Sequence, residues 1–341
     1  MASPSTERIG LKHGAGGRAM RMLIGEVFAS LGGPVDGIGL SALDDGAALR
    51  LGDKWIVVTT DSHVVHPIFF PGGDIGRLAV CGTVNDLAVM GATEPLGLTC
   101  AVVLEDGFLR RDLERIRDSM KAACAEARTT VVTGDTKVMG RGEVDGIIIN
   151  TAGLAVTDRV VTDAGLRPGD RILVSGTLGD HGLAVMTQRR DLKLEGNIVS
   201  DVAPVNGLVR AALAAGGDGI VAMKDPTRGG LASALHEMAG KARVGIVLEE
   251  ERLPVTPEVR AAAEILGIDP LSVANEGKVV LGVRPEVAER VLAALREHPL
   301  GRRAALLGTC IAERPGNLIL DTGLGKRLVA ELEGEPLPRI C

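Results

Sequence analysis

The stretch WIVVTTDSHVVHPIFFPGGDIGRLAVCGTVNDLAVMGA, residues 55–92, sets the fold of the first half of the chain. Residues 55–60 are apolar and β-branched, which predicts a buried strand that ends at Asp61. Residues 74–91 carry apolar side chains at helical spacing, which predicts a helix that ends at Gly91. Beyond residues 55–92, the same criteria predict strands at 96–104, 130–133 and 146–156 and a helix at 110–127.

A turn-rich segment, TDAGLRPGDR at 162–171, interrupts this pattern and marks a domain boundary. The pattern then restarts with a strand at 171–176 and a glycine-rich turn, GTLGDHG, at 176–182. The elements expected beyond it are helices near 205–215, 229–241, 256–266 and 285–297, and strands at 244–248, 278–283, 303–311 and 317–321. The alternation predicts an α/β or α+β domain present twice, although no sequence repeat relates the halves.

The composition excludes several classes of function. Of the 341 residues, 45% are apolar and 1% aromatic, so the cores consist of aliphatic side chains and no aromatic platform for single-stranded nucleic acid exists. The net charge is −6 and the basic residues are scattered, which argues against a nucleic-acid or anionic membrane partner. No apolar run is long enough to span a bilayer, and the N-terminus lacks the apolar core of a signal peptide. We therefore expect a soluble, cytoplasmic protein.

Cys341 differs from the other four cysteines because it is the last residue of the chain. The others lie in apolar segments without metal-binding or disulfide spacing, as buried structural cysteines do. The preceding residues, EGEPLPRIC at 333–341, contain two prolines at alternate positions, which keep the segment extended. Spacing alone leaves two interpretations open: a frayed terminus, or a thiol on a strap that reaches a distant site.

Five short motifs contain an aspartate at a turn or at the end of an element. They are LDDGA (43–47), TTDSH (59–63), VNDLA (84–88), TGDTK (133–137) and KDPTRGG (224–230). Each alone is typical of a turn former or a helix cap. Together with glycine loops such as HGAGG (13–17), they suit a nucleoside triphosphate with Mg²⁺, which binds carboxylate and phosphate oxygens. No GxxxxGK[ST] motif occurs, so the chain has no P-loop.

Four further polar residues are candidates for chemistry. His13 and His181 lie in glycine loops, where contact with phosphate or substrate is expected. Lys137 follows a Gly-Asp turn and either neutralises phosphate or is a solvated surface lysine. Glu276, in ANEGK (274–278), is either a turn residue or a proton acceptor.

A resemblance to a known family joins these motifs. In this order, HGAGG, TTDSHVVHPIFFPGGDIG, CGTVNDLAVMGA, VTGDTKV, ILVSGTLGDHG, DPTRGG, ANEGK and the terminal PRIC resemble the [NiFe]-hydrogenase maturation factors of the HypE family. The resemblance runs from about residue 8 to the last residue. The terminal PRIC is specific, because the related aminoimidazole ribotide synthetases, selenophosphate synthetases and thiamine-monophosphate kinases lack it.

The resemblance implies a two-domain α+β fold of the aminoimidazole ribotide synthetase (PurM)-like type, with a flexible C-terminal tail. We expect a glycine-rich segment at 1–35, an ATP-binding and dimerisation domain at 36–161, an α+β domain at 162–322 and a tail at 323–341. A homodimer would form through the N-terminal domains.

The resemblance also implies ATP and Mg²⁺ as cofactors and assigns residues to them. Metal binding falls to Asp45, Asp61, Asp86 and Asp225. Nucleotide binding falls to His13, Gly14, Gly16, Asp45, Asp61, Asp86, Gly134 and Asp135, and catalysis to Cys341, Lys137, Glu276 and Asp86. The family usually has alanine where this chain has Pro226, which puts the backbone contacts of that loop in question.

The function implied is ATP-dependent dehydration of an S-carbamoyl group on Cys341 to a thiocyanate, the source of a cyanide ligand for the hydrogenase iron. A HypF-type carbamoyltransferase would load the thiol, and a HypC–HypD complex would receive the cyanide. Three alternatives remain: a selenophosphate synthetase, a purine-biosynthesis enzyme and a non-catalytic scaffold. The first is disfavoured because no cysteine precedes Cys81, the second because it gives Cys341 no role, and the third because the polar motifs are intact.

Overall fold

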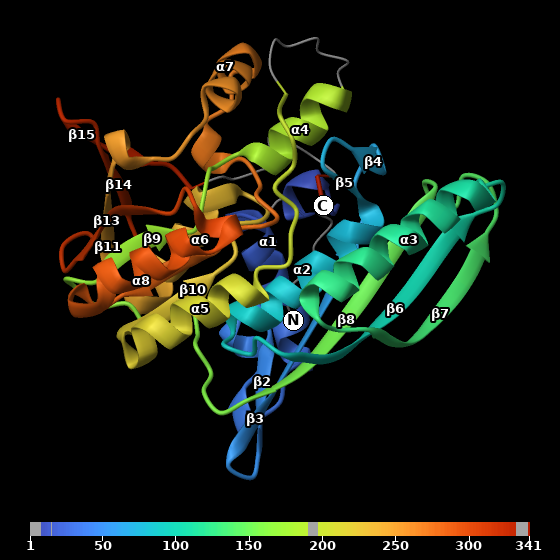
Figure 1. Cartoon of the computed structure of the whole chain (residues 1–341), viewed down its shortest axis with the longest axis horizontal. Helices are drawn as coiled ribbons and strands as arrows, with labels where there is room; N and C mark the ends of the chain where they lie inside the picture. Colours follow the sequence, from blue (N-terminus) through green and yellow to red (C-terminus); the bar gives the residue numbers. More distant parts are fainter. Residues whose placement is uncertain (1–7, 15, 190–196, 332–339) are drawn as a thin grey trace, which may run out of the picture.

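The computed structural model describes residues 8–14, 16–189, 197–331 and 340–341. Within these residues the chain forms a six-stranded and a seven-stranded sheet, each with helices packed against it (Figure 1).

The first sheet has the order β1-β2-β3-β8-β6-β7 and is antiparallel except for the parallel pair β6 and β7. Its strands are β1 (Gly37–Ile38), β2 (Ala47–Leu51), β3 (Lys54–His63), β8 (Ile147–Thr157), β6 (Pro95–Glu105) and β7 (Val131–Met139). Helices α2 (Ile75–Val89) and α3 (Arg110–Ala127) cover one face of this sheet (Figure 1). A small hairpin, β4 (Phe69–Phe70) and β5 (Gly73–Asp74), precedes α2.

Helix α2 lies at the centre of the molecule and connects the two halves. Its first turn is capped by Asp74, whose carboxylate accepts hydrogen bonds from the backbone N–H groups of Gly76 and Arg77 at 2.8 and 2.9 Å. The helix is apolar nearly all round, which is typical of a helix buried on every side. At its C-terminal end, Ala88 and Val89 pack into the core of the second domain. This position carries Asp86 to the junction of the domains.

The second sheet has the order β10-β12-β9-β13-β11-β14-β15. Its strands are β9 (Arg171–Val174), β10 (Ile220–Lys224), β11 (Gly245–Glu249), β12 (Val280–Val283), β13 (Ala305–Ile311), β14 (Leu318–Asp321) and β15 (Lys326–Val329). Helices α5 (Asn206–Gly216) and α8 (Pro285–Glu297) share one core with this sheet, and α6 (Gly230–Ala242) shares a separate one. Helices α4 (Asp180–Arg189) and α7 (Pro257–Leu266) pack together and join the core of the first domain.

The observed elements correct several sequence-based expectations. β3 continues through Asp61 to His63, because residues 59–63 keep pairing with β8. β7 extends to Met139, so the TGDTK motif lies inside an edge strand and not at a turn. The GTLGDHG segment leads into helix α4, which the sequence did not predict because its glycines are typical of a turn. The region expected as the tail, 323–341, contains a strand, β15, which pairs with β14. Residues 332–339 of this region lie outside the described part.

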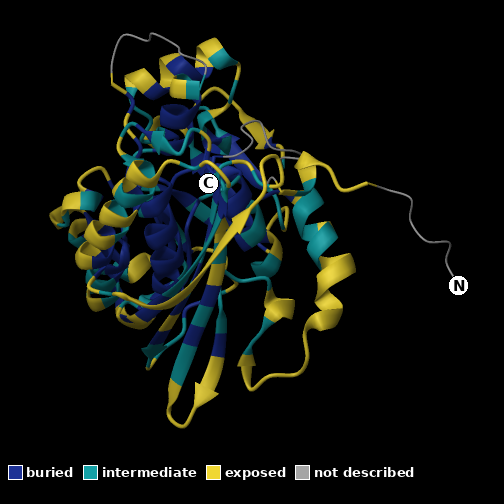
Figure 2. Cartoon of the chain, turned by 90° about the vertical axis from the view of Figure 1, so that its right-hand side faces the viewer, coloured by how far each residue is buried: buried dark blue, intermediate teal, exposed yellow. Residues whose placement is uncertain are grey.

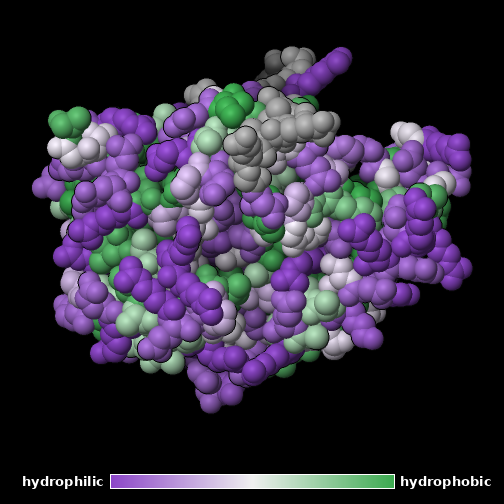
Figure 3. Space-filling model, turned by 45° about the horizontal axis from the view of Figure 1, so that its top comes forward, coloured by the Kyte–Doolittle hydropathy of each residue, from purple (hydrophilic) through white to green (hydrophobic). Residues whose placement is uncertain are grey.

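The region expected as an N-terminal glycine-rich segment contains short helical turns and one helix, α1 (Arg18–Leu23). Several of its apolar side chains, including Leu11, Val27 and Leu31, are exposed, and Figure 2 shows the exposed and half-buried residues of this part at the edge of the buried body. Figure 3 shows a surface on which hydrophilic residues surround scattered apolar patches. Among the described residues, no helix is both long and apolar enough to cross a membrane.

Candidate active site

A cavity of about 640 Å³ lies between the two domains and gathers most of the residues that the sequence singled out. The first domain contributes the whole LDDGA motif, the middle of β3 and Asp86 of α2. The second domain contributes the loop between β10 and α6 and the loop that carries Glu276. The last residue of the chain, Cys341, lines the same cavity.

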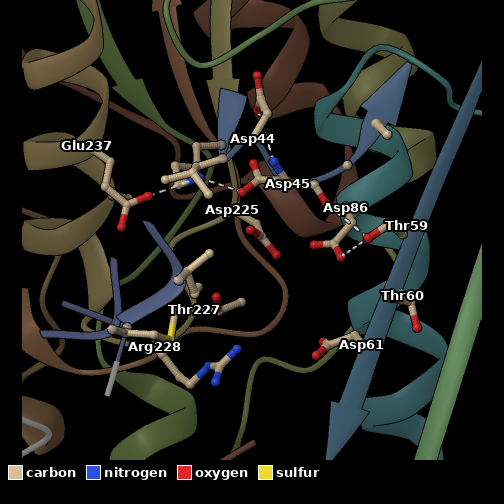
Figure 4. A pocket seen from close by; sticks show the side chains of 18 of the residues that line it. Asp44, Asp45, Thr59, Thr60, Asp61, Asp86, Asp225, Thr227, Arg228 and Glu237 are labelled. Carbon is tan, nitrogen blue, oxygen red and sulfur yellow. Dashed lines mark hydrogen bonds and ion pairs between the residues drawn. The ribbon is translucent and has the colours of Figure 1, made fainter. Parts of the chain in front are cut away.

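Three aspartates, of which Asp225 is buried and Asp45 and Asp86 are half-buried, converge on one side of the cavity. Asp45 precedes β2, Asp86 lies on α2, and Asp225 directly follows β10 (Figure 4). Thr59 on β3 joins two of them, because its hydroxyl lies 2.9 Å from both the Asp45 carbonyl oxygen and Asp86 Oδ2. Asp45 Oδ2 is buried and accepts no hydrogen bond from a described residue. The cluster therefore has an oxygen atom free to bind a cation such as Mg²⁺, which takes oxygen ligands.

The pKa values of these carboxyl groups show that the cluster is electrostatically strained. Burial, together with the nearby Asp45, raises the pKa of Asp225 to about 8. Burial also raises the pKa of Asp86 well above its ordinary value, with Asp225 and Asp61 adding to the effect. Burial raises the pKa of Asp45 in spite of its contact with Lys224. Like charges in a dry site resist joint ionisation, so a bound cation would relieve all three.

Lys224 supplies a positive charge to the aspartate cluster. Its ammonium group pairs with Asp45, and lies 3.4 Å from Asp163 Oδ2 and 3.3 Å from Glu237 Oε2. Burial opposes its charged form, but these carboxylates hold the pKa of Lys224 well above its usual range. Lys241 also pairs with Asp163, at 2.7 Å. The pairs fix the LDDGA loop of the first domain against β10 and α6 of the second.

Asp61 stays ionised on the opposite side of the cavity. Burial alone would raise its pKa, but the adjacent His63 ring and Arg228 hold the pKa of Asp61 down at about 2. His63 Nε2 lies 3.2 Å from Asp61 Oδ2. Figure 4 shows Asp61 and Arg228 at one end of the site and Asp45 and Asp225 at the other. Asp61 and Arg228 thus place an ionised carboxylate and a guanidinium group beside the strained cluster.

Glu276 is a buried carboxyl group, and one of its oxygens lacks a hydrogen-bond partner in the described part of the chain. It is 2% exposed, and its Oε1 atom makes no hydrogen bond with any described residue. Burial raises the pKa of Glu276 well above its ordinary value, and Asp225 and Asp61 add to it. Asn85 of α2 fixes the backbone at this point by donating to the Glu276 carbonyl oxygen at 2.9 Å. An unpartnered acceptor at a cavity wall suits a substrate N–H group.

The predicted glycine loop at 13–17 is only partly at the cavity. Gly16 lines it and packs so closely on Arg228 that an added Cβ would lie 2.7 Å from the Arg228 carbonyl oxygen. Gly14 accepts a hydrogen bond from the Arg228 guanidinium group at 3.4 Å. His13 does not line the cavity, and its ring lies within hydrogen-bonding distance of Gly10.

One predicted group is not brought to the cavity within a single chain. Gly134, Asp135 and Lys137 lie on β7, the edge strand of the first sheet, and none of them lines the cavity. Lys137 is 67% exposed and pairs with Asp135 at 2.8 Å. The reason is the continuation of β7 as a strand, which carries the motif away from the domain junction.

Several residues of the site escaped the sequence analysis. Thr59, Lys224 and Glu237 line the cavity and contact its carboxylates. Thr59 and Lys224 belong to the motifs TTDSH and KDPTRGG, so their position beside a candidate aspartate is the sequence feature that could have identified them. Glu237 lies on α6 without a motif, and only the tertiary structure identifies it.

A metal site is not preformed in the described part of the chain, where no three His, Cys, Asp or Glu side chains lie close enough to hold an ion. The donor set nevertheless fits Mg²⁺, which takes carboxylate oxygens together with phosphate oxygens and water. Asp45 Oδ2 lacks a partner, and Asp86 and Asp225 have raised pKa values because burial and negative neighbours oppose their ionisation.

Comparisons with known proteins agree with this architecture. Residues 43–157 match the family model "AIR synthase related protein, N-terminal domain", and residues 167–321 match "AIR synthase related protein, C-terminal domain". A relative from Rhizobium leguminosarum bv. viciae, named carbamoyl dehydratase HypE, is 50% identical over 98% of this chain and 95% of its own length.

Two solved structures extend the comparison. The crystal structure of a HypE–HypF complex contains a chain that is 44% identical, with a TM-score of 0.85 over 91% of this chain and 99% of that one. The crystal structure of a HypE protein in complex with ATP is 43% identical, with a TM-score of 0.81 over 98% of this chain and all of that one. Sequence, fold and cavity lead to one conclusion: the chain belongs to the HypE family of carbamoyl dehydratases.

Proposed function

We propose that this protein dehydrates an S-carbamoyl group on its own Cys341 to a thiocyanate at the expense of ATP. The observation that carries the proposal is the position of Cys341, which lines the same cavity as the aspartate cluster and the unpartnered carboxyl group of Glu276. The terminal residue of one chain thereby meets the polar groups of two domains.

The cavity suits ATP with Mg²⁺. We propose that Asp45, Asp86 and Asp225 hold the cation, whose charge would offset the repulsion that raises their pKa values. When bound, the cation would supply charge stabilisation for the transferring phosphoryl group. Arg228 offers a guanidinium group to phosphate oxygens, and Gly16 leaves room for their close approach.

The chemistry begins with a poor leaving group. The carbamoyl oxygen of a loaded Cys341 would have to depart as water. Transfer of the γ-phosphoryl group of ATP onto this oxygen would break the bond to ADP, release ADP and one N–H proton, and turn the oxygen into a phosphate ester. Loss of the second N–H proton then breaks the C–O bond, expels phosphate and leaves S–C≡N on Cys341. Glu276 is the proposed proton acceptor, since its raised pKa makes the ionised carboxylate a stronger base.

We further propose that the protein is a homodimer in which Lys137 acts on the partner's cavity. The face of the first sheet opposite α2 carries Lys137, level with Val103 of β6 and Ile148 of β8. Further along the same face, Thr60 and Ala152 line the cavity. A two-fold axis that runs parallel to the strands between β8 and β6 would lay β7 of one chain over β3 of the other, because these two strands lie equally far from that line in the sheet order. Lys137 of the partner subunit would then approach Glu276.

Mixed dimers test this arrangement. Lys137→Ala and Glu276→Gln chains, each inactive alone, are mixed and allowed to exchange subunits. If the residues act across the dimer, half of the dimers contain one complete site, and about one quarter of the wild-type activity returns. If both act within one chain, every site lacks a residue and the mixture stays inactive.

The partners are part of the proposal. A HypF-type carbamoyltransferase would load Cys341, in keeping with the HypE–HypF complex solved for a relative. A HypC–HypD complex would receive the cyanide. The thiol must therefore leave the cavity to be loaded and return to it for dehydration.

Phosphate release tests the function. Protein loaded with a carbamoyl group by a HypF-type enzyme should release one phosphate from ATP per loaded chain, whereas unloaded protein and the Cys341→Ala variant should release none. A scaffold would hydrolyse no ATP in either state. Equal phosphate release with and without the carbamoyl group would indicate another ATP-dependent reaction and overturn the proposal.

A further inference from the structure

The last two described residues, Ile340 and Cys341, occupy a built docking site. The Ile340 side chain is 1% exposed and belongs to the core of the first domain together with Phe70 and Leu183. The C-terminus lies close to the start of α4 (Figure 1). A frayed terminus would leave such a side chain in water, so this terminus is specifically bound.

The backbone of the terminus is also held, by the ring of His181 at the start of α4. His181 Nε2 lies 2.9 Å from the Ile340 carbonyl oxygen, and Nδ1 lies 2.8 Å from Ser200 Oγ. A carbonyl oxygen can only accept, so Nε2 carries the hydrogen and Nδ1 accepts from the Ser200 hydroxyl. Ser200 Oγ accepts in turn from the Val202 N–H group at 3.1 Å. The chain of bonds fixes both the tautomer and the orientation of the ring.

The surroundings keep this ring neutral and in place. Burial lowers the pKa of His181, although Asp201 and the Ile340 carbonyl act in the opposite direction. The Phe70 ring packs edge-on against the His181 ring, with centroids 5.3 Å apart and planes at 88°. Phe70 thus supports both the ring and the isoleucine that the ring secures.

We infer that His181 is a positioning residue that secures the terminal peptide in the cavity, and that it thereby sets how often the Cys341 thiol is available to partners. The inference rests on the proposed function, in which this thiol alternates between the cavity and the outside. When the terminus leaves, the Ile340 carbonyl exchanges His181 for water and the Ile340 side chain is exposed. The two contacts together set the balance between the bound and released terminus.

Residues 200–201 connect the contacts of His181 to the loop that carries Glu276. Next to Ser200, the Asp201 carboxylate accepts hydrogen bonds from the backbone N–H groups of Glu276 and Gly277, at 3.2 and 3.3 Å. Lys278 pairs with the same carboxylate at 2.8 Å. Ser200 and Asp201 are neighbours in the chain, so one holds the ring that binds the terminus while the other holds the loop of the proposed proton acceptor.

Protection of the Cys341 thiol tests the inference without ATP or a carbamoyl group. A maleimide attached to a bulky polymer, too large for the cavity, is added to the full-length protein, and its attachment to Cys341 is followed by mass analysis of the C-terminal peptide. Loss of one hydrogen bond in His181→Ala should raise the rate of modification about fivefold. His181→Gln keeps an amide donor near the Nε2 position and should restore protection. Ile340→Ala, which alters only the terminus, should raise the rate ~10-fold or more.

His236→Ala is the matched control, because the ring of His236 lies 3.1 Å from another backbone carbonyl, that of Val329, outside the docking site. It should leave the rate unchanged, and thermal unfolding of each variant shows whether it remains folded. An unchanged rate in folded His181→Ala would overturn the inference, whatever Ile340→Ala shows. If His181→Ala does not fold, Ser200→Ala decides, because it removes the hydroxyl that orients the His181 ring, and an unchanged rate in that variant would overturn the inference.

Activity separates this inference from the proposed function. His181→Ala protein should accept the carbamoyl group at least as fast as the wild type. Once loaded, it should lose water several-fold more slowly, and His181→Gln should restore the wild-type rate. If even the wild type never loses water, the proposed function fails, whereas the protection experiment still decides the role of His181.

Discussion

Replacing Asp225 by asparagine should stabilise the ligand-free protein while it abolishes dehydration. Burial and the neighbouring Asp45 raise the pKa of Asp225 from 3.8 to about 8. Below about pH 4 the carboxyl group is protonated in both the folded and unfolded chain and costs nothing. As the pH rises towards 8, the unfolded chain releases a proton that the folded protein keeps. The free energy of unfolding then falls by ~1.4 kcal/mol per pH unit.

Thermal unfolding gives the size of the effect. Between about pH 5 and about pH 7 the Asp225 contribution amounts to ~2.7 kcal/mol. With an unfolding entropy of ~2.1 cal/mol/K per residue, the 341 residues convert this into about 4 °C. Without Mg²⁺ or ATP, the unfolding temperature of the wild type should therefore fall by about 4 °C more than that of Asp225→Asn over this pH range.

A surface carboxylate supplies the control for this measurement. Asp218, whose side chain is fully exposed, lies outside the cavity, and Asp218→Asn should leave the slope of the wild type unchanged. Mg²⁺ with ATP should stabilise the wild type but not Asp225→Asn. An Asp225→Asn protein that keeps the wild-type slope, or is less stable than the wild type at pH 7, would refute the account of a strained carboxylate cluster.

Two further substitutions test the cavity. Asp86→Asn removes a negative charge but can keep the hydrogen bond to Thr59. The Mg²⁺ concentration needed for half-maximal ATP turnover should therefore rise ~10-fold or more. An unchanged Mg²⁺ requirement would reduce Asp86 to a structural role. Gly16→Ala adds a Cβ against the Arg228 backbone at a φ of +79°, a strain of ~1–3 kcal/mol, so titration with a fluorescent ATP analogue should show weaker binding. Unaltered affinity would place the nucleotide away from this loop.

The sequence predicted the two-domain α+β fold because its strong periodic segments lie in the cores. Residues 74–91, predicted as one helix, form α2 from Ile75 to Val89, and 110–127 matches α3 in full. The failures occur where glycine and polar residues outweigh the apolar signal. α4 begins with Asp180 and His181 after a glycine-rich turn, and β7 carries Gly134 and Asp135 inside a strand.

The candidate site was predicted in part, for a similar reason. Asp45, Asp61, Asp86, Asp225, Glu276 and Cys341 all line one cavity, as the motifs and the resemblance led us to expect. The contacts of Lys224 with three carboxylates depend on two domains meeting, which no local pattern reveals. Lys137 lies on an edge strand away from the cavity, and only the proposed dimer would bring it to a site.

The mass of the terminal peptide before and after ATP is added tests the central claim most directly. Wild-type protein carrying a carbamoyl group on Cys341 should lose one water when ATP and Mg²⁺ are supplied, and should lose none without ATP. Glu276→Gln, which keeps the shape of the side chain but not its basicity, should keep the carbamoyl mass under both conditions. Loss of water at the wild-type rate in Glu276→Gln would assign the proton to another group. A carbamoyl group that stays intact in wild-type protein supplied with ATP would contradict the claim that this chain is a carbamoyl dehydratase.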